Sequence, residues 1–300
     1  MVSLAVAGID DSPRKGKPCP ACGGRDRFTL FPNGRHFCRG CGGGDAIDLI
    51  QKVYGCGFKE AQEIGGGIVS KSAPVLASRK EPDPTAKIER ARQIIAQSKM
   101  LHPESEAWRY LVETRKLPVE LLGFELRCVD RLPYYEQDAD GKPVITGHYA
   151  AMVAPIRSQA GEIIAVHLTY LLAGQKAPVA SPRKIIGSPK GGAIRLCLAG
   201  DEVGLAEGIE TAIAARALFD KPVWSCLSAS LAESVELPDH IRRVHFYADA
   251  DEAGRKAAVA FMRRAKQQNR TPGECKSPGA LGDFYDSYLE VISGEDNTTI

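Results

Sequence analysis

The sequence predicts a multi-domain α/β chain with an N-terminal β ribbon on a metal site, an α+β middle domain and a C-terminal α/β domain. Two Cys-x-x-Cys pairs lie near the N-terminus, and a Ser-, Pro-, Ala- and Lys-rich stretch follows them. In the last third of the chain strands alternate with helices, which is typical of a mostly parallel sheet. We therefore expect domains at residues 12–67, 86–198 and 199–292, with a linker at 68–85.

Hydrophobic periodicity gives the elements of the middle domain. Apolar residues recur at helical spacing over residues 86–101, and residues 105–116 are a second expected helix. The apolar, β-branched stretches 151–156 and 163–170 read as strands separated by a turn. A further short strand is expected at residues 193–198.

Composition describes an ordinary globular protein. The 300 residues are 44% hydrophobic and 25% charged, with a net charge of only +2. No apolar run approaches the ~20 residues that a membrane helix needs, and the N-terminus lacks the basic start of a signal peptide. Nine cysteines are an odd number and too few for a disulfide scaffold. We expect a cytoplasmic protein without membrane contact.

The paired cysteines have the spacing of a zinc site. Cys19, Cys22, Cys38 and Cys41 form the pattern Cys-x2-Cys-x15-Cys-x2-Cys, and a hairpin between the pairs would bring four thiolates together. Four thiolates leave no open position, so we expect one structural Zn²⁺ per chain that supplies much of the folding energy of the ribbon. A redox dithiol or a chance pairing is the alternative, and His36 could replace one ligand.

The expected ribbon is basic and aromatic. Cations that bind phosphate, combined with aromatic faces that stack on bases, are typical of proteins that hold single-stranded nucleic acid. Alternatively, the aromatic rings form the small core and the charges are merely solvated. Residues 13–41 contain seven cations and a single acidic residue, Asp26. The cations are Arg14, Lys15, Lys17, Arg25, Arg27, Arg35 and Arg39, and the aromatic residues Phe28, Phe31 and Phe37 are interleaved with them.

Acidic residues follow two strands of the C-terminal domain. Glu207 comes after an apolar strand that ends at Ala206, and Asp249 and Asp251 follow the strand 243–248. Ligands of parallel sheets bind at the carboxyl ends of strands, and converging carboxylates select Mg²⁺ or Mn²⁺. Such a site suits phosphoryl transfer on polynucleotides. Asp-x-Asp after a strand also occurs in phosphatases and glycosyltransferases, and either aspartate could simply cap the following helix.

With both patterns in hand, the sequence resembles DnaG-type bacterial and phage DNA primases, most closely those of satellite phages and mobile elements. The stretches 19–28 and 37–51 resemble their zinc-ribbon domain and its trailing helix. Glu207-Gly208-Ile209-Glu210-Thr211-Ala212 and Asp249-Ala250-Asp251-Glu252-Ala253-Gly254-Arg255 resemble the two hallmark motifs of the Toprim domain. The segment 167–196 is similar to the one that precedes Toprim in mobile-element primases.

The resemblance implies a fold and a set of roles. It implies a β zinc ribbon, an α+β primase middle domain and an α/β Toprim domain. Glu207 would act in acid–base chemistry and bind metal with Asp249 and Asp251, and Glu210 could add a further ligand. The template or nucleotides would be bound by Arg25, Arg27, Phe28 and Arg35 of the ribbon and by a basic track of Lys176, Arg183, Lys184, Lys190 and Arg195. A solvated charged loop is the alternative for that track.

One stretch departs from the family pattern. Residues 269–279 read as a loop where family members have another strand and an acidic motif, so Asp283 and Asp286 are only remnant candidates for metal binding. The sequence also has no Gly-x-x-x-x-Gly-Lys-Ser/Thr loop, so a separate replicative helicase is the expected partner.

The expected activity is that of a DNA primase, a nucleotidyltransferase that joins ribonucleoside triphosphates on single-stranded DNA in a bacterial or phage-infected cell. A Toprim nuclease or topoisomerase-like protein is the rival enzyme. A catalytically degenerate, DNA-binding replication accessory protein is the rival without chemistry.

Overall fold

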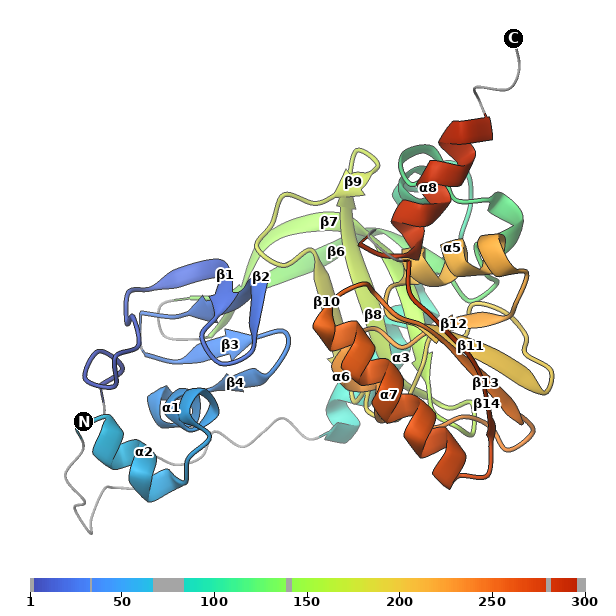
Figure 1. Ribbon diagram of the computed structural model, residues 1–300. Helices are drawn as coiled ribbons and strands as arrows, with labels where there is room; N and C mark the ends of the chain where they lie inside the picture. The colour runs from blue at the N-terminus through green and yellow to red at the C-terminus, as the bar shows by residue number, and fades with distance from the viewer. Residues whose placement is uncertain (1–2, 33, 67–83, 139–141, 279–281, 296–300) are drawn as a thin grey trace. The chain divides into compact units, whose positions relative to one another are not determined.

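The computed structural model describes residues 3–32, 34–66, 84–138, 142–278 and 282–295 (Figure 1). The chain divides into two compact units, residues 1–79 and 80–300. Most of the expected linker at 68–85 lies outside the described residues, and its last two residues begin a helix. The predicted fold class is confirmed: the first unit holds a β ribbon, and the second holds an antiparallel sheet with helices, followed by a parallel sheet.

The first unit is an antiparallel ribbon followed by two short helices (Figure 1). The Asp45 side chain accepts from the backbone N–H groups of Ile47 and Asp48, which explains where the first helix begins. Leu49 and Ile50 of that helix share a small core with Phe28 and Leu30. The elements are β1 (Arg14–Cys19), β2 (Gly23–Leu30), β3 (His36–Cys38), β4 (Gly42–Gly44), α1 (Ala46–Tyr54) and α2 (Phe58–Ile64).

The middle part is an antiparallel sheet in the order β10-β8-β7-β6-β5, with β9 paired to β8. Helix α3 packs on it through Ala91 and Ile94, which are buried with Val166 and Leu168. The elements are α3 (Pro84–Gln97), β5 (Lys99–Met100), α4 (Glu106–Trp108), the π-helix η1 (Arg109–Thr114), the 3-10 helix η2 (Val119–Leu121), β6 (Arg127–Gln137), β7 (Pro143–Arg157), β8 (Ile163–Leu172), β9 (Gln175–Lys176) and β10 (Arg183–Gly187).

Two expectations for the middle part need correction. The expected helix 105–116 is a short α4 that passes into the π-helix η1. The expected strand 193–198 makes only isolated bridges, from Ala193 to Arg157 and from Ile194 to Ser225. That segment is apolar because it is packed between elements, and its backbone bonds are divided between two sheets.

The C-terminal part is a parallel sheet in the order β12-β11-β13-β14. Parallel order places the carboxyl ends of all its strands at one edge, which is where this class of sheet binds ligands. Among the described residues, no helix is long and apolar enough to cross a membrane. The elements are β11 (Glu202–Ala206), α5 (Ile209–Phe219), β12 (Val223–Ser225), α6 (Ala229–Ala232), β13 (Arg243–Tyr247), α7 (Glu252–Gln267), β14 (Thr271–Lys276) and α8 (Phe284–Glu295).

The loop expected at residues 269–279 is wrong, because β14 lies there and pairs in parallel with β13. Pro272 and Gly273 weaken the strand signal in the sequence. The strand is at the edge of the sheet, where a proline is tolerated because one side of the strand needs no partner. The fourth strand whose loss would have weakened the family resemblance is therefore present.

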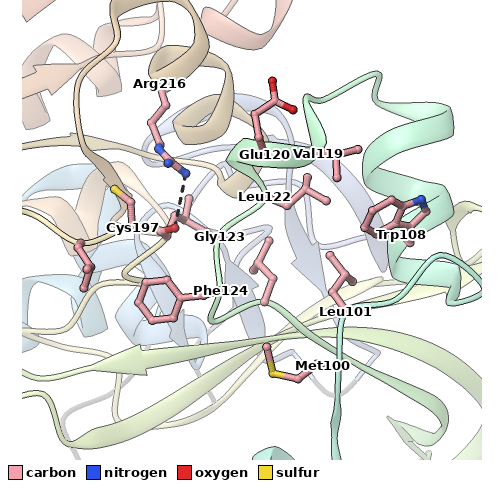
Figure 2. A pocket seen from close by; sticks show the side chains of 13 residues that line it. Met100, Leu101, Trp108, Val119, Glu120, Leu122, Gly123, Phe124, Cys197 and Arg216 are labelled. Carbon is pink, nitrogen blue, oxygen red and sulfur yellow. Dashed lines mark hydrogen bonds between the residues drawn. The ribbon is translucent and has the colours of Figure 1, made fainter.

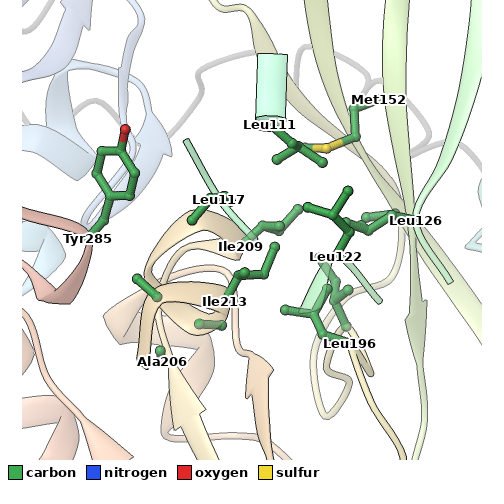
Figure 3. Close-up of a cluster of buried hydrophobic side chains, with 14 of the residues drawn as sticks. Leu111, Leu117, Leu122, Leu126, Met152, Leu196, Ala206, Ile209, Ile213 and Tyr285 are labelled. Atoms are coloured by element: carbon green, nitrogen blue, oxygen red, sulfur yellow. The ribbon is translucent and has the colours of Figure 1, made fainter. Parts of the chain in front are cut away.

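The middle sheet and the parallel sheet share one hydrophobic core (Figure 3). Leu111 and Met152 of the middle part are buried with Ile209 and Ile213 of α5. Helix α5 begins directly after Glu207, so this shared core fixes the acidic edge of the sheet relative to the middle part.

The centre of the parallel sheet leaves no room for a side chain at Gly204. A methyl group there would lie 2.4 Å from Cε2 of the buried Tyr247 ring. We predict that Gly204→Ala lowers the free energy of unfolding by about 1–3 kcal/mol, because a rigid ring must move. Urea denaturation measures this. Gly200→Ala, where nothing lies within 4 Å, is the matched control, and equal stability of the two variants would contradict the packing.

Candidate functional site

The four cysteines of the ribbon converge as their spacing predicts. Their Sγ atoms all lie within 4.8 Å of one another, with 3.6 Å between Cys19 and Cys41 and 3.5 Å between Cys22 and Cys38. A tetrahedral zinc with bonds of about 2.3 Å places its sulfurs roughly 3.8 Å apart, so the set fits the ion. The zinc-ligand prediction therefore agrees with the geometry, and Zn²⁺ is the metal that this donor set favours.

His36 and Phe28 belong to the core of the ribbon. Phe28 is fully buried and stacks on His36 with ring centroids 5.9 Å apart. The Nδ1 atom of His36 lies 3.1 Å from the Asp45 carbonyl oxygen, and His36 is not part of the cysteine group. The prediction that Phe28 stacks on a base is therefore wrong, because its ring packs inside the ribbon. Phe37, which is 49% exposed, offers the accessible ring instead.

The ribbon cations differ in what they contact. Arg39 pairs with Asp26 at 2.9 Å, while Arg25 and Arg35 are exposed. The side chain of Arg27 is half-buried and lies against Gly24 and Gly40, where a Cβ would collide with it. The two glycines therefore leave space for the Arg27 guanidinium.

At the carboxyl edge of the parallel sheet, three acidic segments meet. Glu207 follows β11 and Asp249 follows β13, and these two strands are hydrogen-bonded neighbours. The Ala250 N–H donates to the Gly282 carbonyl at 3.0 Å, which holds the segment before α8 beside Asp249. Asp283 thereby joins the edge, and its Oδ2 accepts from the Thr211 hydroxyl at 3.3 Å. The remnant candidate is therefore part of the acidic group.

Asp249 is the centre of this group. Burial, together with the neighbouring charges of Glu207, Asp283, Asp251 and Asp286, raises the pKa of Asp249 to about 8. Its Oδ1 atom is buried and has no hydrogen-bond partner among the described residues. A buried acceptor surrounded by like charges calls for a cation.

Asp251 caps the N-terminus of α7, which was the alternative role considered for it. Its Oδ1 accepts from the Gly254 N–H at 2.7 Å at the start of α7. A Cβ on Gly254 would lie 2.5 Å from the Asp249 carbonyl oxygen, so the first turn of α7 touches the backbone of Asp249. The pattern Asp249-Ala250-Asp251-Glu252-Ala253-Gly254 therefore fixes both aspartates relative to the helix.

Glu210 lies outside the carboxylate group. It accepts a hydrogen bond from the Tyr110 hydroxyl, and its Oε1 lies 3.6 Å from the Lys176 ammonium. Burial opposes its charge, but Lys176 and Tyr110 outweigh burial and hold the pKa of Glu210 at about 2. Burial lowers the pKa of Lys176 in turn. The structure therefore places Glu210 against a cation, and Glu210 is not among the charges that raise the pKa of Asp249.

Tyr110 and Arg115, which are hydrogen-bonded to each other near Glu210, stand in no sequence pattern that would have predicted a functional role. The Arg115 Nε donates to the Tyr110 hydroxyl at 3.1 Å, and its guanidinium lies 4.9 Å from the centre of the Tyr285 ring. Tyr285 is two residues from Asp283. Tyr110 belongs to the π-helix η1, a feature often found at functional sites. Only these long-range contacts reveal that Tyr110 lies against Glu210 of α5 and Arg115 against Tyr285 of α8.

The predicted basic track is only partly brought together. Arg183 is exposed on β10 and is among the charges that act on Glu210 and Lys176. Lys184, the next residue of the strand, instead lies 3.8 Å from the centre of the Tyr134 ring and donates to the Tyr135 carbonyl. The Arg195 Nη2 donates to Ser158 and Gln159 carbonyls at 2.6 and 3.0 Å. A single track of five cations is therefore wrong, because successive strand residues face opposite ways.

A pocket of about 530 Å³ lies away from these groups (Figure 2). Its lining is mostly apolar and includes Leu101, Trp108, Phe124 and Leu198. The Arg216 Nη1 at its wall donates to the Leu196 carbonyl at 3.5 Å, as the dashed line shows. None of the carboxylates of the acidic edge lines it.

Comparison with known families identifies the parts of the chain. The zinc-binding domain of primase-helicase matches residues 14–47, and the Toprim domain matches residues 202–273. Between them, a domain of unknown function matches residues 85–196. The resemblance to DnaG-type primases is thereby confirmed, since a primase-type zinc ribbon precedes a Toprim domain in one chain.

Solved primases have similar structures at low sequence identity. The primase fragment of the bacteriophage T7 primase-helicase protein is 18% identical with a TM-score of 0.40, covering 95% of this chain and 98% of that chain. A DNA primase domain from Pseudomonas aeruginosa is 17% identical with a TM-score of 0.42, covering 72% and 77%. The zinc-binding and RNA polymerase domains of Aquifex aeolicus primase are 14% identical with a TM-score of 0.41, covering 96% and 76%. Each likeness is remote, so the function must be inferred from the residues of this chain itself.

Removal of zinc should unfold the ribbon alone. We predict that Cys22→Ser loses the metal and that hydrogen exchange over residues 14–54 becomes fast, because the small core of the ribbon does not replace the folding energy of the metal. Residues 84–278 should keep their protection. Elemental analysis should find about one zinc per wild-type chain. Cys275→Ser, an exposed cysteine outside the ribbon, is the control, and a metal-free yet protected ribbon would contradict the prediction.

Glu210 should matter for stability more than for metal binding. We predict that Glu210→Gln lowers the free energy of unfolding by about 2 kcal/mol, because Lys176 loses its counter-charge in a half-buried place. Mn²⁺ affinity, measured by electron paramagnetic resonance, should stay within about twofold of wild type, because the carboxylate is already occupied by Tyr110 and Lys176. Glu60→Gln on the exposed face of α2 is the control for stability. A large loss of Mn²⁺ affinity would show that Glu210 is a metal ligand.

Proposed function

We propose that this chain, which joins a primase-type zinc ribbon to a Toprim domain, is a DNA primase that makes short RNA primers on single-stranded DNA. Replication of a phage or mobile element, in the cytoplasm of a bacterial or infected cell, is the setting we propose. The observation that carries the proposal is the acidic edge around Asp249. Cations lie near the segments that form it: Lys176 and Arg183 act on Glu210, three residues after Glu207, and Arg115 lies against Tyr285, two residues after Asp283.

We assign Mg²⁺ or Mn²⁺ to the acidic edge. Glu207, Asp249, Asp251 and Asp283 supply hard oxygen ligands, and the orphaned Oδ1 of Asp249 supports a bound cation. Among the described residues, only the four cysteines bring three or more ligand atoms within 4.8 Å of one another. The looser carboxylates suit Mg²⁺, which keeps several waters and is often completed by substrate phosphates.

The reaction that fits this edge is nucleotidyl transfer. The 3′-hydroxyl oxygen of one nucleotide would attack the α-phosphorus of the next, and the bond to pyrophosphate would break. The bound cation would stabilise the charge on the phosphates. Glu207 is the carboxylate we assign to the hydroxyl proton, because the Ala229 N–H fixes its Oε2 at 3.0 Å while the residue stays partly accessible.

The neighbouring cations suit the triphosphate of a ribonucleotide. Arg115 and Lys176 both face the Tyr110 ring, at 5.3 and 5.7 Å from its centre, and Arg183 adds a third positive charge. Glu210 cancels only one of the three. The excess positive charge beside the acidic edge would bind phosphate oxygens. Lys190, which is exposed on the loop after β10, would extend this group towards a template.

We propose that the ribbon binds single-stranded template. Arg25 and Arg35 are exposed, and Phe37 presents an accessible ring near Arg27 and Arg39. This pattern suits phosphate contacts combined with base stacking. We keep the domain limits 12–67, 86–198 and 199–292 for the ribbon, the primase subdomain and the Toprim domain, and a separate helicase as a partner.

The structure bears differently on the two rivals. A degenerate accessory protein rested on a damaged third motif, but β14 and Asp283 are both in place. A Toprim nuclease would use the same carboxylates, and the products of the reaction distinguish it from a primase.

We predict that Asp249→Asn reduces primer synthesis by about 100-fold or more, because the central carboxylate of the acidic edge is lost. Purified chain is incubated with single-stranded DNA, Mg²⁺ or Mn²⁺ and labelled ribonucleotides, and short RNA is resolved on a gel. Asp201→Asn, at the opposite edge of the same sheet, is the matched control. Shortened DNA would indicate a nuclease, and binding without new RNA would overturn the proposed activity.

A further inference from the structure

The turn after β12 holds Glu207 from two sides. Ser225 ends β12 opposite Ala206, and its side chain is fully buried. Its hydroxyl donates to the Glu207 carbonyl oxygen at 2.7 Å and accepts from the Leu227 N–H at 3.3 Å. One buried hydroxyl therefore links the main chain of Glu207 to the turn that follows the neighbouring strand.

Leu227 has a left-handed backbone with φ of 73°. This conformation costs a residue with a side chain roughly 1–2 kcal/mol, so the surroundings must hold it. The Ser225 hydroxyl accepts the Leu227 N–H, and the Cys226 N–H donates to the Ala206 carbonyl at 2.8 Å. The reversal of the chain at Leu227 is therefore fixed from the strand that precedes Glu207.

The reversal delivers a donor to the carboxylate. Two residues later, the Ala229 N–H lies 3.0 Å from Oε2 of Glu207. The same turn thus fixes the carbonyl of Glu207 through Ser225 and its carboxylate through Ala229. Loss of this donor would remove one of the contacts that orient the carboxylate beside Asp249.

We infer that Ser225 is a positioning residue for Glu207, acting through the left-handed turn at Leu227. The inference rests on the proposed function in one respect, the assignment of Glu207 as a metal-binding carboxylate of the acidic edge. Ser225 lies fully buried behind the strand end, so it acts through Glu207 and not on a substrate. Groups that orient metal ligands commonly change metal affinity or activity by about 10–100-fold.

The first test is Ser225→Ala, which removes the hydroxyl and leaves the packing. We expect Mn²⁺ affinity, measured by electron paramagnetic resonance, to fall about tenfold. In primer synthesis kcat should fall by a similar factor, while the KM for ribonucleotides changes less than about twofold because Arg115 and Lys176 are untouched. Thermal unfolding of the variant reports its stability alongside. Mn²⁺ affinity and kcat equal to wild type would overturn the inference.

A pair of variants at Leu227 keeps the inference testable if Ser225→Ala does not fold. Both Leu227→Gly and Leu227→Val lose side-chain contacts, but glycine adopts the left-handed backbone freely and valine resists it. We expect Leu227→Gly to keep Mn²⁺ affinity within about twofold and Leu227→Val to lose about tenfold. Equal affinities for the two variants would overturn the role of the turn.

The Mn²⁺ measurement separates this inference from the proposed function. If the wild-type chain binds Mn²⁺ but makes no RNA, the primase proposal fails, and the affinities of the Ser225 and Leu227 variants still decide the inference. If Asp249→Asn does not reduce Mn²⁺ binding, the metal is not at the acidic edge and the inference falls with that assignment.

Discussion

The mutual repulsion of carboxylates at one edge of the parallel sheet is the constraint to which the rest of the second unit responds. Parallel order brings Glu207 and Asp249 to that edge, and the bond from Ala250 to Gly282 adds Asp283. Hydrogen bonds offset part of the repulsion. The Ala229 N–H donates to Glu207, the Gly254 N–H to Asp251 and the Thr211 hydroxyl to Asp283. Asp249 receives no such donor at Oδ1 among the described residues. The charge of Asp249 is therefore the least stabilised of the group, which raises its pKa and makes it the carboxyl that gains most from a bound cation.

The same constraint explains why the middle part and the parallel sheet form one unit. Cations from the middle part, Arg115 and Lys176, approach the acidic edge through Tyr110 and Glu210. Partly buried cations need support, and the shared core of Ile209 and Ile213 with the middle part keeps the elements that carry them in place. Glu210 serves as the local counter-charge, which limits repulsion among the cations without neutralising them. Cations near the proposed metal-binding edge would suit a substrate that has phosphate oxygens beyond those bound to the metal.

Local spacing made half of this site predictable from the sequence. The cysteines and the acids after β11 and β13 stand in short patterns whose geometry is fixed within a few residues. The rest depends on contacts between distant segments. Tyr110 meets Glu210 a hundred residues away, and β14 is stabilised by pairing rather than by its own composition. The basic track failed for a simpler reason: Arg183 and Lys184 are adjacent on a strand, so they point to opposite faces.

The zinc site and the metal site that we propose at the acidic edge therefore differ in what maintains them. The cysteine site draws all its ligands from residues 19–41, and folding of this short segment and metal binding are one event. The acidic edge draws on β11, β12, β13 and α8, and its geometry exists only after the long-range contacts have formed. Substitutions far from the carboxylates, in the turn at Leu227 or in the π-helix around Tyr110, should therefore affect its chemistry. Substitutions in the second unit should leave the zinc ligands unaffected, because all four ligands lie in the first unit and share its core.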